Sequence, residues 1–337
     1  MFVHLVFDGV ADGPLGVALD VVHTAARLVA AGVVSAPAVS PGALRQRVAS
    51  VHGRAVRSGA ERVVPVDGAF GAGSPRRGDV LVLAGLGAAT ERDVERLLRR
   101  TDVRRALPLL ARAAARGVTL AASCSATFVL AEAGVLDARR ATTTGWLARP
   151  FARRFPAVEV TAERMVVDAG GVVTAGSALG HADLMLALVA RTVGPALAAA
   201  VARYLVLDER VSQARYAVGE HLRSSDPTIL ALERFVLANL ARQVSIAEMA
   251  RATATSPRTL ARRVEAALGT TPRRFARRLR MARALHLLDT TRDNVERVAA
   301  RVGYADAAAF RRNFRRETGE APRAGASPRL RGWAASS

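Results

Sequence analysis

The segment Ile246–Pro272 is IAEMARATATSPRTLARRVEAALGTTP, and the segment Val295–Pro322 is VERVAARVGYADAAAFRRNFRRETGEAP. The two segments form an internal repeat, because apolar, glycine and proline positions coincide between them. Each copy predicts a short helix, a tight turn and a longer second helix that begins at a polar cap, Ser256 in the first copy and Asp306 in the second. The repeat therefore predicts two helix-turn-helix units.

The second helix of each copy has an apolar face and a polar face. Leu260 and Val264 in one copy, and Phe310 and Phe314 in the other, repeat at i, i+4 and are expected to face the core. Arginine can donate two parallel hydrogen bonds to guanine, and alanine permits close approach or contact with a thymine methyl. The residues that we predict to contact double-stranded DNA are Arg258, Thr259, Arg262, Arg263, Ala307, Ala308, Arg311, Arg312 and Asn313.

A helix predicted over Arg273–Leu288 joins the two units. Its apolar face is expected to hold the units about one DNA turn apart. Its outer arginines are better suited to phosphate contacts than to base contacts. The arginines on this helix are Arg273, Arg274, Arg277, Arg278, Arg280 and Arg283.

This C-terminal region resembles the DNA-binding module of the AraC/XylS family of transcription activators. The resemblance covers roughly a hundred residues and depends on SPRTLARR, the following GTTP turn, and VAARVGYADAAAFRRNFRRETGEAP. It implies sequence-specific DNA binding and regulation of transcription. Two positions depart from the family pattern: Ala254 replaces the usual glycine of the first turn, and Ala309 stands where an aromatic or polar residue is common.

The length and charge of the chain agree with two domains, one of which binds nucleic acid, and the absence of certain motifs argues against membrane and metal-dependent functions. The chain has 337 residues and a formal net charge of +20, and all of its basic residues are arginine. Residues 227–337 hold 22 Arg against nine acidic residues, so most of the positive excess lies in the last third. The absence of an apolar leader or an 18-residue apolar run predicts a cytoplasmic protein that does not bind membranes. No metal or phosphate-loop motif is present, so we predict no cofactor and no metal.

The first half alternates β-branched runs with helical patterns. This alternation predicts an α/β domain with a flavodoxin-like parallel sheet and helices on both faces. A hairpin or excursion is expected within 50–66, and one long helix over His181–Leu205. The expected strands are Phe2–Phe7, Val33–Val39, Asp79–Ala84 and Val118–Ser123, with three short ones near Val158–Thr161, Met165–Asp168 and Val172–Thr174.

The predicted organisation has four parts. Residues 1–205 form a ligand-sensing and dimerisation domain, and residues 206–226 form a linker. Residues 227–325 form the helix-turn-helix domain, whose first helix is expected to be capped by Asp226 with Pro227 in its first turn. Residues 326–337 are of low complexity and are expected to be a disordered tail.

The single cysteine, Cys124, lies between a predicted strand and a predicted helix in AASCSATFVLAEAGVL. A parallel sheet presents nucleophiles and ligands at this kind of corner. Residues 1–205 resemble the PfpI-like, class I glutamine amidotransferase-like domains, most specifically over 118–145. The pairing with an AraC-type module resembles the GlxA-type regulators. We predict that Cys124, Ser125 and Gly85 belong to a vestigial active site that binds a small effector.

Enzymes of this superfamily place a histidine immediately after the nucleophile or a short way along, and in this chain the residue after Cys124 is Ser125. We therefore predict no enzymatic activity. The weak catalytic candidates are Cys124 and His181, since His181 is the one histidine expected near a strand end. The alternative interpretation of Cys124 is a small buried residue at a tight turn, with no chemical role. The acidic neighbour that such domains place against the cysteine stays open among Asp8, Asp12 and Asp20.

The favoured hypothesis is a homodimeric regulator in which an unidentified effector biases how the helix-turn-helix modules meet DNA. One alternative is a cysteine-dependent hydrolase or amidase with an appended DNA-binding module. Another, based on charge alone, is a non-specific nucleic-acid or scaffold protein whose binding collapses with salt.

Overall fold

The computed structural model describes residues 1–34, 42–71, 75–207, 226–291, 293–318 and 321–322. The chain divides into two compact units, Met1–Gln213 and Ala214–Ser337. Residues 208–225 of the expected linker and the whole of the expected tail lie outside the described residues. No helix in the described part of the chain is long and apolar enough to cross a membrane.

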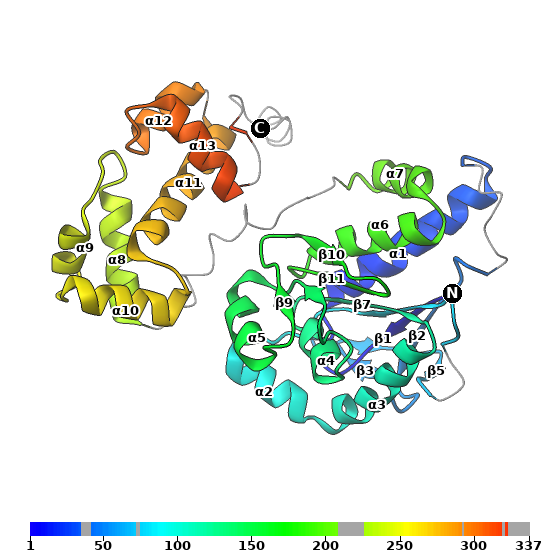
Figure 1. Cartoon of the computed structure of the whole chain (residues 1–337). Helices are drawn as coiled ribbons and strands as arrows, with labels where there is room; N and C mark the ends of the chain where they lie inside the picture. Colours follow the sequence, from blue (N-terminus) through cyan, green and yellow to red (C-terminus); the bar gives the residue numbers. More distant parts are fainter. Residues whose placement is uncertain (35–41, 72–74, 208–225, 292, 319–320, 323–337) are drawn as a thin grey trace. The chain divides into compact units, whose positions relative to one another are not determined.

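The N-terminal unit is built on a seven-stranded sheet with the order β10-β11-β7-β6-β1-β2-β5 (Figure 1). All neighbouring strands are parallel except β10, which is antiparallel to β11. This sheet confirms the predicted flavodoxin-like class. The strands are β1 (Phe2–Leu5), β2 (Gln46–Ser50), β5 (Gly68–Ala69), β6 (Val80–Leu83), β7 (Thr119–Ser123), β10 (Val166–Asp168) and β11 (Val172–Ala175).

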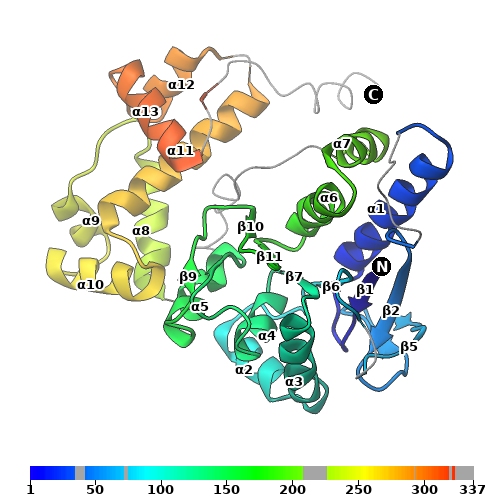
Figure 2. The same ribbon diagram turned by 45° about the vertical axis from the view of Figure 1, so that its right-hand side comes forward.

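Helices cover both faces of the sheet, because successive strand residues point to opposite sides. Phe2 and Val80 contribute to a core with α1, α6 and α7, whereas Val3 and Leu81 contribute to a core with α2, α3 and α4 (Figure 2). The helix bounds are α1 (Asp12–Ala30), α2 (Glu91–Arg99), α3 (Thr101–Ala115), α4 (Ala126–Glu132), α6 (Gly180–Thr192) and α7 (Pro195–Tyr204).

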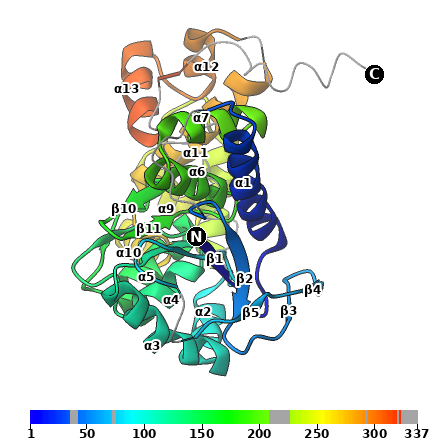
Figure 3. The ribbon, with the colours of Figure 1, turned by 90° about the vertical axis from the view of Figure 1, so that its right-hand side faces the viewer.

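Smaller elements complete this unit. The hairpin expected within 50–66 is confirmed as an antiparallel pair, β3 with β4, beside the β2 end of the sheet (Figure 3). The remaining elements are β3 (Val56–Arg57), β4 (Val63–Val64), β8 (Arg140–Ala141), η1 (Gly145–Leu147), α5 (Ala148–Arg154) and β9 (Glu159–Val160).

Two elements of this half differ from the sequence prediction. The prediction of one helix over His181–Leu205 is wrong, because Gly194, with φ 141°, and Pro195, which has no N–H, separate α6 from α7. The second strand of the sheet is β2, which the sequence reading missed. Residues 35–39 of the strand expected at Val33–Val39 lie outside the described residues, and Val33 and Val34 are not in a strand.

The C-terminal unit is helical and contains the two predicted helix-turn-helix units, α9–α10 and α12–α13 (Figure 1). The predicted caps are confirmed: Asp226, Ser256 and Asp306 each accept hydrogen bonds from backbone N–H groups of the helix that follows. The helices are α8 (Pro227–Ala238), α9 (Ile246–Ala252), α10 (Pro257–Leu268), α11 (Pro272–Thr290), α12 (Val295–Arg301) and α13 (Ala307–Thr318).

Helix α11 contributes to two separate small cores. Its first half packs Phe275 and Leu279 against α8, α9 and α10, with Leu260 and Val264 buried as predicted. Its second half packs against α12 and α13, where Phe310 is buried in ring contact with Phe314. The predicted role of this helix as the connection between the two units is therefore confirmed.

Candidate functional site

The outer face of α10 presents two arginines that are free to bind. Arg258 and Arg262 are exposed and form no hydrogen bond or ion pair with any described residue. They are four residues apart, so they lie on one face of the helix, away from the buried Leu260 and Val264. This face offers unengaged guanidinium donors to a partner.

The other two α10 candidates are engaged within the protein. The Thr259 hydroxyl accepts a hydrogen bond from the Ser256 hydroxyl at 2.9 Å. Arg263 donates to the hydroxyl of Thr228 at the start of α8 and lies 3.9 Å from the Asp226 carboxylate. DNA contacts by Thr259 and Arg263 stay predictions.

On α13 the candidate side chains are more fully engaged. Arg311 forms an ion pair with Glu296 of α12 at 2.5 Å, and Arg312 lies 3.9 Å from Asp306. Asn313 donates to the carbonyl of Ala309 at 3.0 Å and accepts from Arg316 at 2.7 Å. Ala308 is exposed and Ala307 is half-buried.

The arginines of α11 do not all belong to its outer face. Arg280 is only 4% exposed and donates to the carbonyl of Arg242 at 2.8 Å, so it is not one of the outer arginines predicted to suit phosphate contacts. Arg277 and Arg278 approach Glu317 of α13 at 2.8 and 3.6 Å. The remaining ones, Arg273, Arg274 and Arg283, are exposed and have no partner among the described residues.

The turn of the second helix-turn-helix unit packs on the loop between α8 and α9, which leads into the first unit. The side-chain amide of Gln243 donates to the carbonyl of Gly303 at 2.9 Å. A Cβ atom added to Gly303 would lie only 2.6 Å from the carbonyl oxygen of Leu240. This contact, which sequence reasoning did not find, holds the turn of the second unit against the loop that precedes the first.

The structure brings Cys124, Ser125 and Gly85 together at the end of β7. Cys124 is buried and has φ 54°, a left-handed conformation that costs a non-glycine residue about 1–2 kcal/mol. A Cβ atom added to Gly85 would lie 3.2 Å from that of Cys124. The Ser125 hydroxyl accepts a hydrogen bond from the backbone N–H of Leu86, in the loop after β6, at 2.9 Å.

His181 does not reach the thiol in the described structure. Its Nδ1 lies 2.8 Å from the hydroxyl of Ser123, and its other ring nitrogen has no hydrogen-bond partner. Complete burial, together with nearby His4, lowers the His181 pKa to about 3. Burial likewise lowers the pKa of His4 to about 4, against the hydrogen bond that its Nε2 donates to the Gln46 side-chain oxygen, which raises it. Both rings are therefore neutral at ordinary pH.

The three acidic candidates are placed as follows. Asp8 accepts from the backbone N–H of Arg57 at 2.8 Å, and Asp12 accepts from Ala60 at 3.2 Å, so both carboxylates hold the β3–β4 hairpin. A hydrogen bond with the Ser58 side chain is the main reason that the pKa of Asp12 is lowered. Asp20 is exposed on α1.

Two buried hydroxyl groups near Cys124 have no hydrogen-bond partner in the described structure: those of Thr127 and Thr144. Thr127 donates its backbone N–H to the Cys124 carbonyl at 3.3 Å. Thr143, which precedes Thr144, donates its hydroxyl to the same carbonyl at 2.8 Å. Buried polar groups are normally paired, so the corner holds unused hydrogen-bonding capacity.

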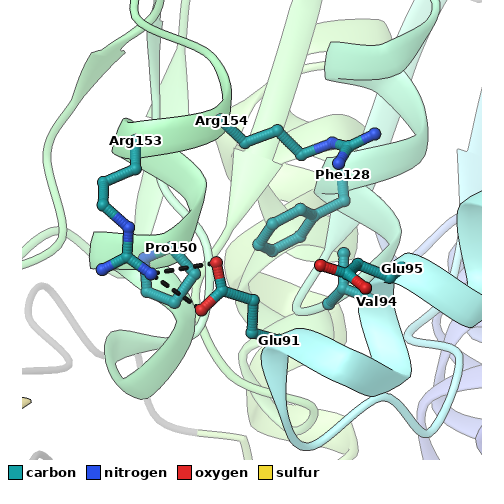
Figure 4. A pocket seen from close by; sticks show the side chains of 7 residues that line it. All are labelled: Glu91, Val94, Glu95, Phe128, Pro150, Arg153 and Arg154. Carbon is teal, nitrogen blue, oxygen red and sulfur yellow. Dashed lines mark hydrogen bonds and ion pairs between the residues drawn. The ribbon is translucent and has the colours of Figure 1, made fainter.

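The described residues of this unit also line two cavities away from this corner. One of about 390 Å³ lies beyond the carboxyl ends of β1 and β2 and is lined by Asp8, Arg54 and Arg100 among others. The other, of about 240 Å³, lies between α2, α4 and α5 over the ring of Phe128, and the Glu91–Arg153 ion pair borders it (Figure 4). Neither is lined by the three predicted ligand residues. Among the described residues, no group of three potential ligands is placed to hold a metal ion.

Fold and sites together define a two-part protein, an α/β domain with a cysteine at a strand-to-helix corner and a helical domain with paired helix-turn-helix units. A family model of the DJ-1/PfpI family matches residues 7–191, and a helix-turn-helix domain model matches residues 249–325. The chain belongs to the DJ-1/PfpI family. The resemblance predicted from the sequence is confirmed in both parts.

Curated relatives match over part of their length. The chain is 28% identical to the HTH-type transcriptional regulator GlxA of Rhizobium meliloti over 209 residues, 61% of this chain and 64% of the relative. It is 30% identical to the HTH-type transcriptional regulator CdhR of Pseudomonas aeruginosa over 224 residues, 61% of this chain and 62% of the relative. The matches thus span slightly less than two thirds of each relative.

Solved structures resemble about three fifths of the chain. DJ-1beta of Drosophila melanogaster matches with a TM-score of 0.49 and 18% identity, covering 62% of this chain and 98% of that one. An AraC family transcriptional regulator from Pseudomonas putida matches with a TM-score of 0.46 and 23% identity, covering 60% of this chain and 98% of that one.

Proposed function

We propose that this protein is a sequence-specific DNA-binding transcription regulator. The observation that carries the proposal is the exposed, unpaired pair Arg258 and Arg262 on the outer face of α10. Side chains in this position of a helix-turn-helix unit reach base edges when the second helix lies in the major groove. Arginine at such a position pairs with the two acceptors of guanine.

Two further observations support specific rather than purely electrostatic binding. Gly303 of the second unit and the buried Arg280 of α11 both contact the loop that leads into the first unit, which supports a fixed spacing of the two units. Fixed spacing selects DNA sites with matching half-site separation, which charge alone does not do. The matching relatives named above are described as HTH-type transcriptional regulators.

A small effector bound at the Cys124 corner of the N-terminal unit is the proposed control. The strained backbone of Cys124, the close approach of Gly85 and the unused hydroxyls of Thr127 and Thr144 support this location. The N-terminal unit is also the proposed site of homodimerisation, and the cytoplasm the proposed location.

The corner is poorly equipped for hydrolysis, which supports a role other than catalysis. His181, the histidine candidate, is engaged with Ser123 and is neutral. A nucleophile at such an elbow also needs backbone N–H donors for the developing oxyanion, and the neighbouring loop supplies one of them. The Leu86 N–H in that loop is already occupied by the hydroxyl of Ser125.

Selection of bound sequences from a random DNA pool tests the proposal. The intact protein is compared with an Arg262→Ala, Arg311→Ala double variant, and with Arg92→Ala, which removes an exposed arginine of the N-terminal unit. We expect the intact protein and Arg92→Ala to enrich the same two-part motif and the double variant to lose it. If no protein enriches a motif, the proposal is wrong and the arginines form only a charged surface.

A further inference from the structure

The two helix-turn-helix units carry the same net charge but differ in how much of it is available. Residues 245–268 contain four Arg and two Glu, and residues 293–318 contain six Arg and four acidic residues, so each segment has a net charge of +2. Bulk charge therefore gives neither unit an advantage on DNA. The difference lies in the pairing of the arginines.

In the first unit most arginines are unengaged. Arg251, Arg258 and Arg262 have no hydrogen bond or ion pair from their side chains to any described residue, and only Arg263 is close to a carboxylate. The acidic Glu248 of this unit is satisfied elsewhere: it closes the capping box with Ser245 and pairs with Arg242. Glu265 is also exposed on α10, but no ion pair joins it to Arg258 or Arg262, so both guanidinium groups on the outer face of α10 stay available.

In the second unit most arginines already have a partner. Asp293 pairs with Arg297 at 3.7 Å and Arg301 at 2.6 Å. Glu296 pairs with Arg311 at 2.5 Å, and Asp306 lies 3.9 Å from Arg312. Arg316 donates to Asn313, which leaves Arg315 as the arginine of this segment without a partner among the described residues.

This difference has a direct consequence for DNA binding. An unpaired arginine displaces counterions when it meets a phosphate, and each such contact contributes about 0.9 to the slope of log affinity against log salt. A paired arginine must first leave its carboxylate, or else bring that negative charge close to the phosphates. A backbone hydrogen bond at Glu296 and the hydrogen bond from Arg311 both lower the pKa of Glu296, so this carboxylate stays charged.

We infer that Arg258 and Arg262 of the first unit supply most of the base recognition and salt-dependent affinity, and that Glu296 restrains the second unit by holding Arg311. The inference rests on the proposed function and adds to it an unequal division of work between the two units. The selected DNA site then has one strongly specified half and one weakly specified half. Glu296 is a specificity-determining residue although it is acidic.

Three variants of the full chain test the division, each by DNA selection and by measuring affinity for the selected site across salt concentrations. Arg258→Ala with Arg262→Ala is expected to lose the strong half-site, to weaken binding tenfold or more, and to lower the salt slope by about 2. Arg311→Ala with Arg312→Ala is expected to keep the strong half-site and to lower the slope by less than about 1. Glu296→Gln is expected to strengthen binding and to sharpen the weak half-site.

All substituted side chains are exposed, so each variant is expected to keep the circular dichroism spectrum of the intact protein. Arg92→Ala serves as the matched loss of one exposed arginine outside the helix-turn-helix units. Equal loss of both half-sites in the two double variants, or weaker binding by Glu296→Gln, overturns the inference while leaving the proposed function standing. Failure of the intact protein to select any motif overturns the proposed function instead.

Discussion

Ala254 and Gly303 occupy the same position in the turns of the two helix-turn-helix units. Each lies two residues after the last residue of the first helix, and each has a left-handed backbone, with φ 50° for Ala254 and 80° for Gly303. Their N–H groups bond to Arg251 and Ala300, and the residues after them bond to Ala250 and Ala299, in the same pattern. One turn carries a Cβ atom in a conformation that favours glycine, and the other cannot carry one.

Ala254→Gly and Gly303→Ala are expected to change the free energy of unfolding in opposite directions. Ala254→Gly relieves about 1–2 kcal/mol of left-handed strain and costs about 0.5–1 kcal/mol of backbone entropy, so we expect a gain of about 0.5–1 kcal/mol. Gly303→Ala adds the same strain and also drives a Cβ atom to 2.6 Å from the Leu240 carbonyl, so we expect a loss of at least about 2 kcal/mol. Amide hydrogen exchange over α9–α13 measures both. A Gly303→Ala variant as stable as the parent would contradict the packing described at Leu240.

The buried pair His4 and His181 predicts a loss of stability in mild acid. Their folded pKa values, about 4 and about 3, lie below the unfolded value of about 6.5, so the unfolded chain binds more protons between these limits. Stability is therefore fully present above pH 6.5 and falls as the pH drops toward 4 and 3. From pH 8 to pH 5 we expect each histidine to cost about 2 kcal/mol.

Urea denaturation followed by Trp146 fluorescence in a Trp333→Phe background measures this dependence. His181→Gln should remove about half of the pH-dependent loss, whatever its effect on stability at pH 8. His23→Gln is the matched control, because His23 is an exposed histidine on α1, and its pH profile should equal that of the parent. A parent protein as stable at pH 5 as at pH 8 would show that the two rings are not buried as described.

Thr143 and Thr144 give a matched pair of buried hydroxyls beside Cys124. Thr143 donates to the Cys124 carbonyl, whereas Thr144 has no hydrogen-bond partner in the described structure. Thr143→Val should lower the free energy of unfolding by about 1 kcal/mol. Thr144→Val should leave it unchanged or raise it, because no hydrogen bond is lost. Equal destabilisation by both variants would mean that the Thr144 hydroxyl already has a partner. That hydroxyl would then be unable to bind an effector.

Sequence periodicity predicted the helix-turn-helix units because their signals are local. The caps Ser256 and Asp306 and the i, i+4 apolar pairs lie within single helices. Strand β2 escaped prediction because QRVAS has neither an apolar run nor β-branched enrichment, and it becomes a strand by pairing with β1. Burial of Arg280 was equally hidden, since its partner is the carbonyl of Arg242, far away along the chain.

The candidate sites divide in the same way. Sequence placed Cys124 and Ser125 at a corner, because a strand followed directly by a helix is a local pattern. It could not show that His181 faces Ser123, or that arginines on α13 are paired while those on α10 are not. The position of His181 and the pairing of the α13 arginines both depend on side chains that folding brings from another helix or strand. Reading an arginine-rich helix as a binding face therefore needs the positions of the carboxylates around it.

Glu317 allows the connection between α13 and α11 to be tested against an exposed ion pair. Its side chain is 7% exposed and approaches both Arg277 and Arg278, whereas Glu296 and Arg311 are each about half exposed. Glu317→Ala leaves two arginines close together without their carboxylate, so we expect a loss of about 1.5–3 kcal/mol in the α12–α13 region. Glu296→Ala should cost no more than about 1 kcal/mol, because solvent screens an exposed pair. Hydrogen exchange of the α12 and α13 amides measures the loss of stability in each variant. Because salt screens buried charges little, the loss in Glu317→Ala should be nearly the same in 1 M salt. Equal effects for the two variants would show that Glu317 is a surface pair like Glu296, and that the position of α13 depends on the Gly303 contact and the apolar core alone.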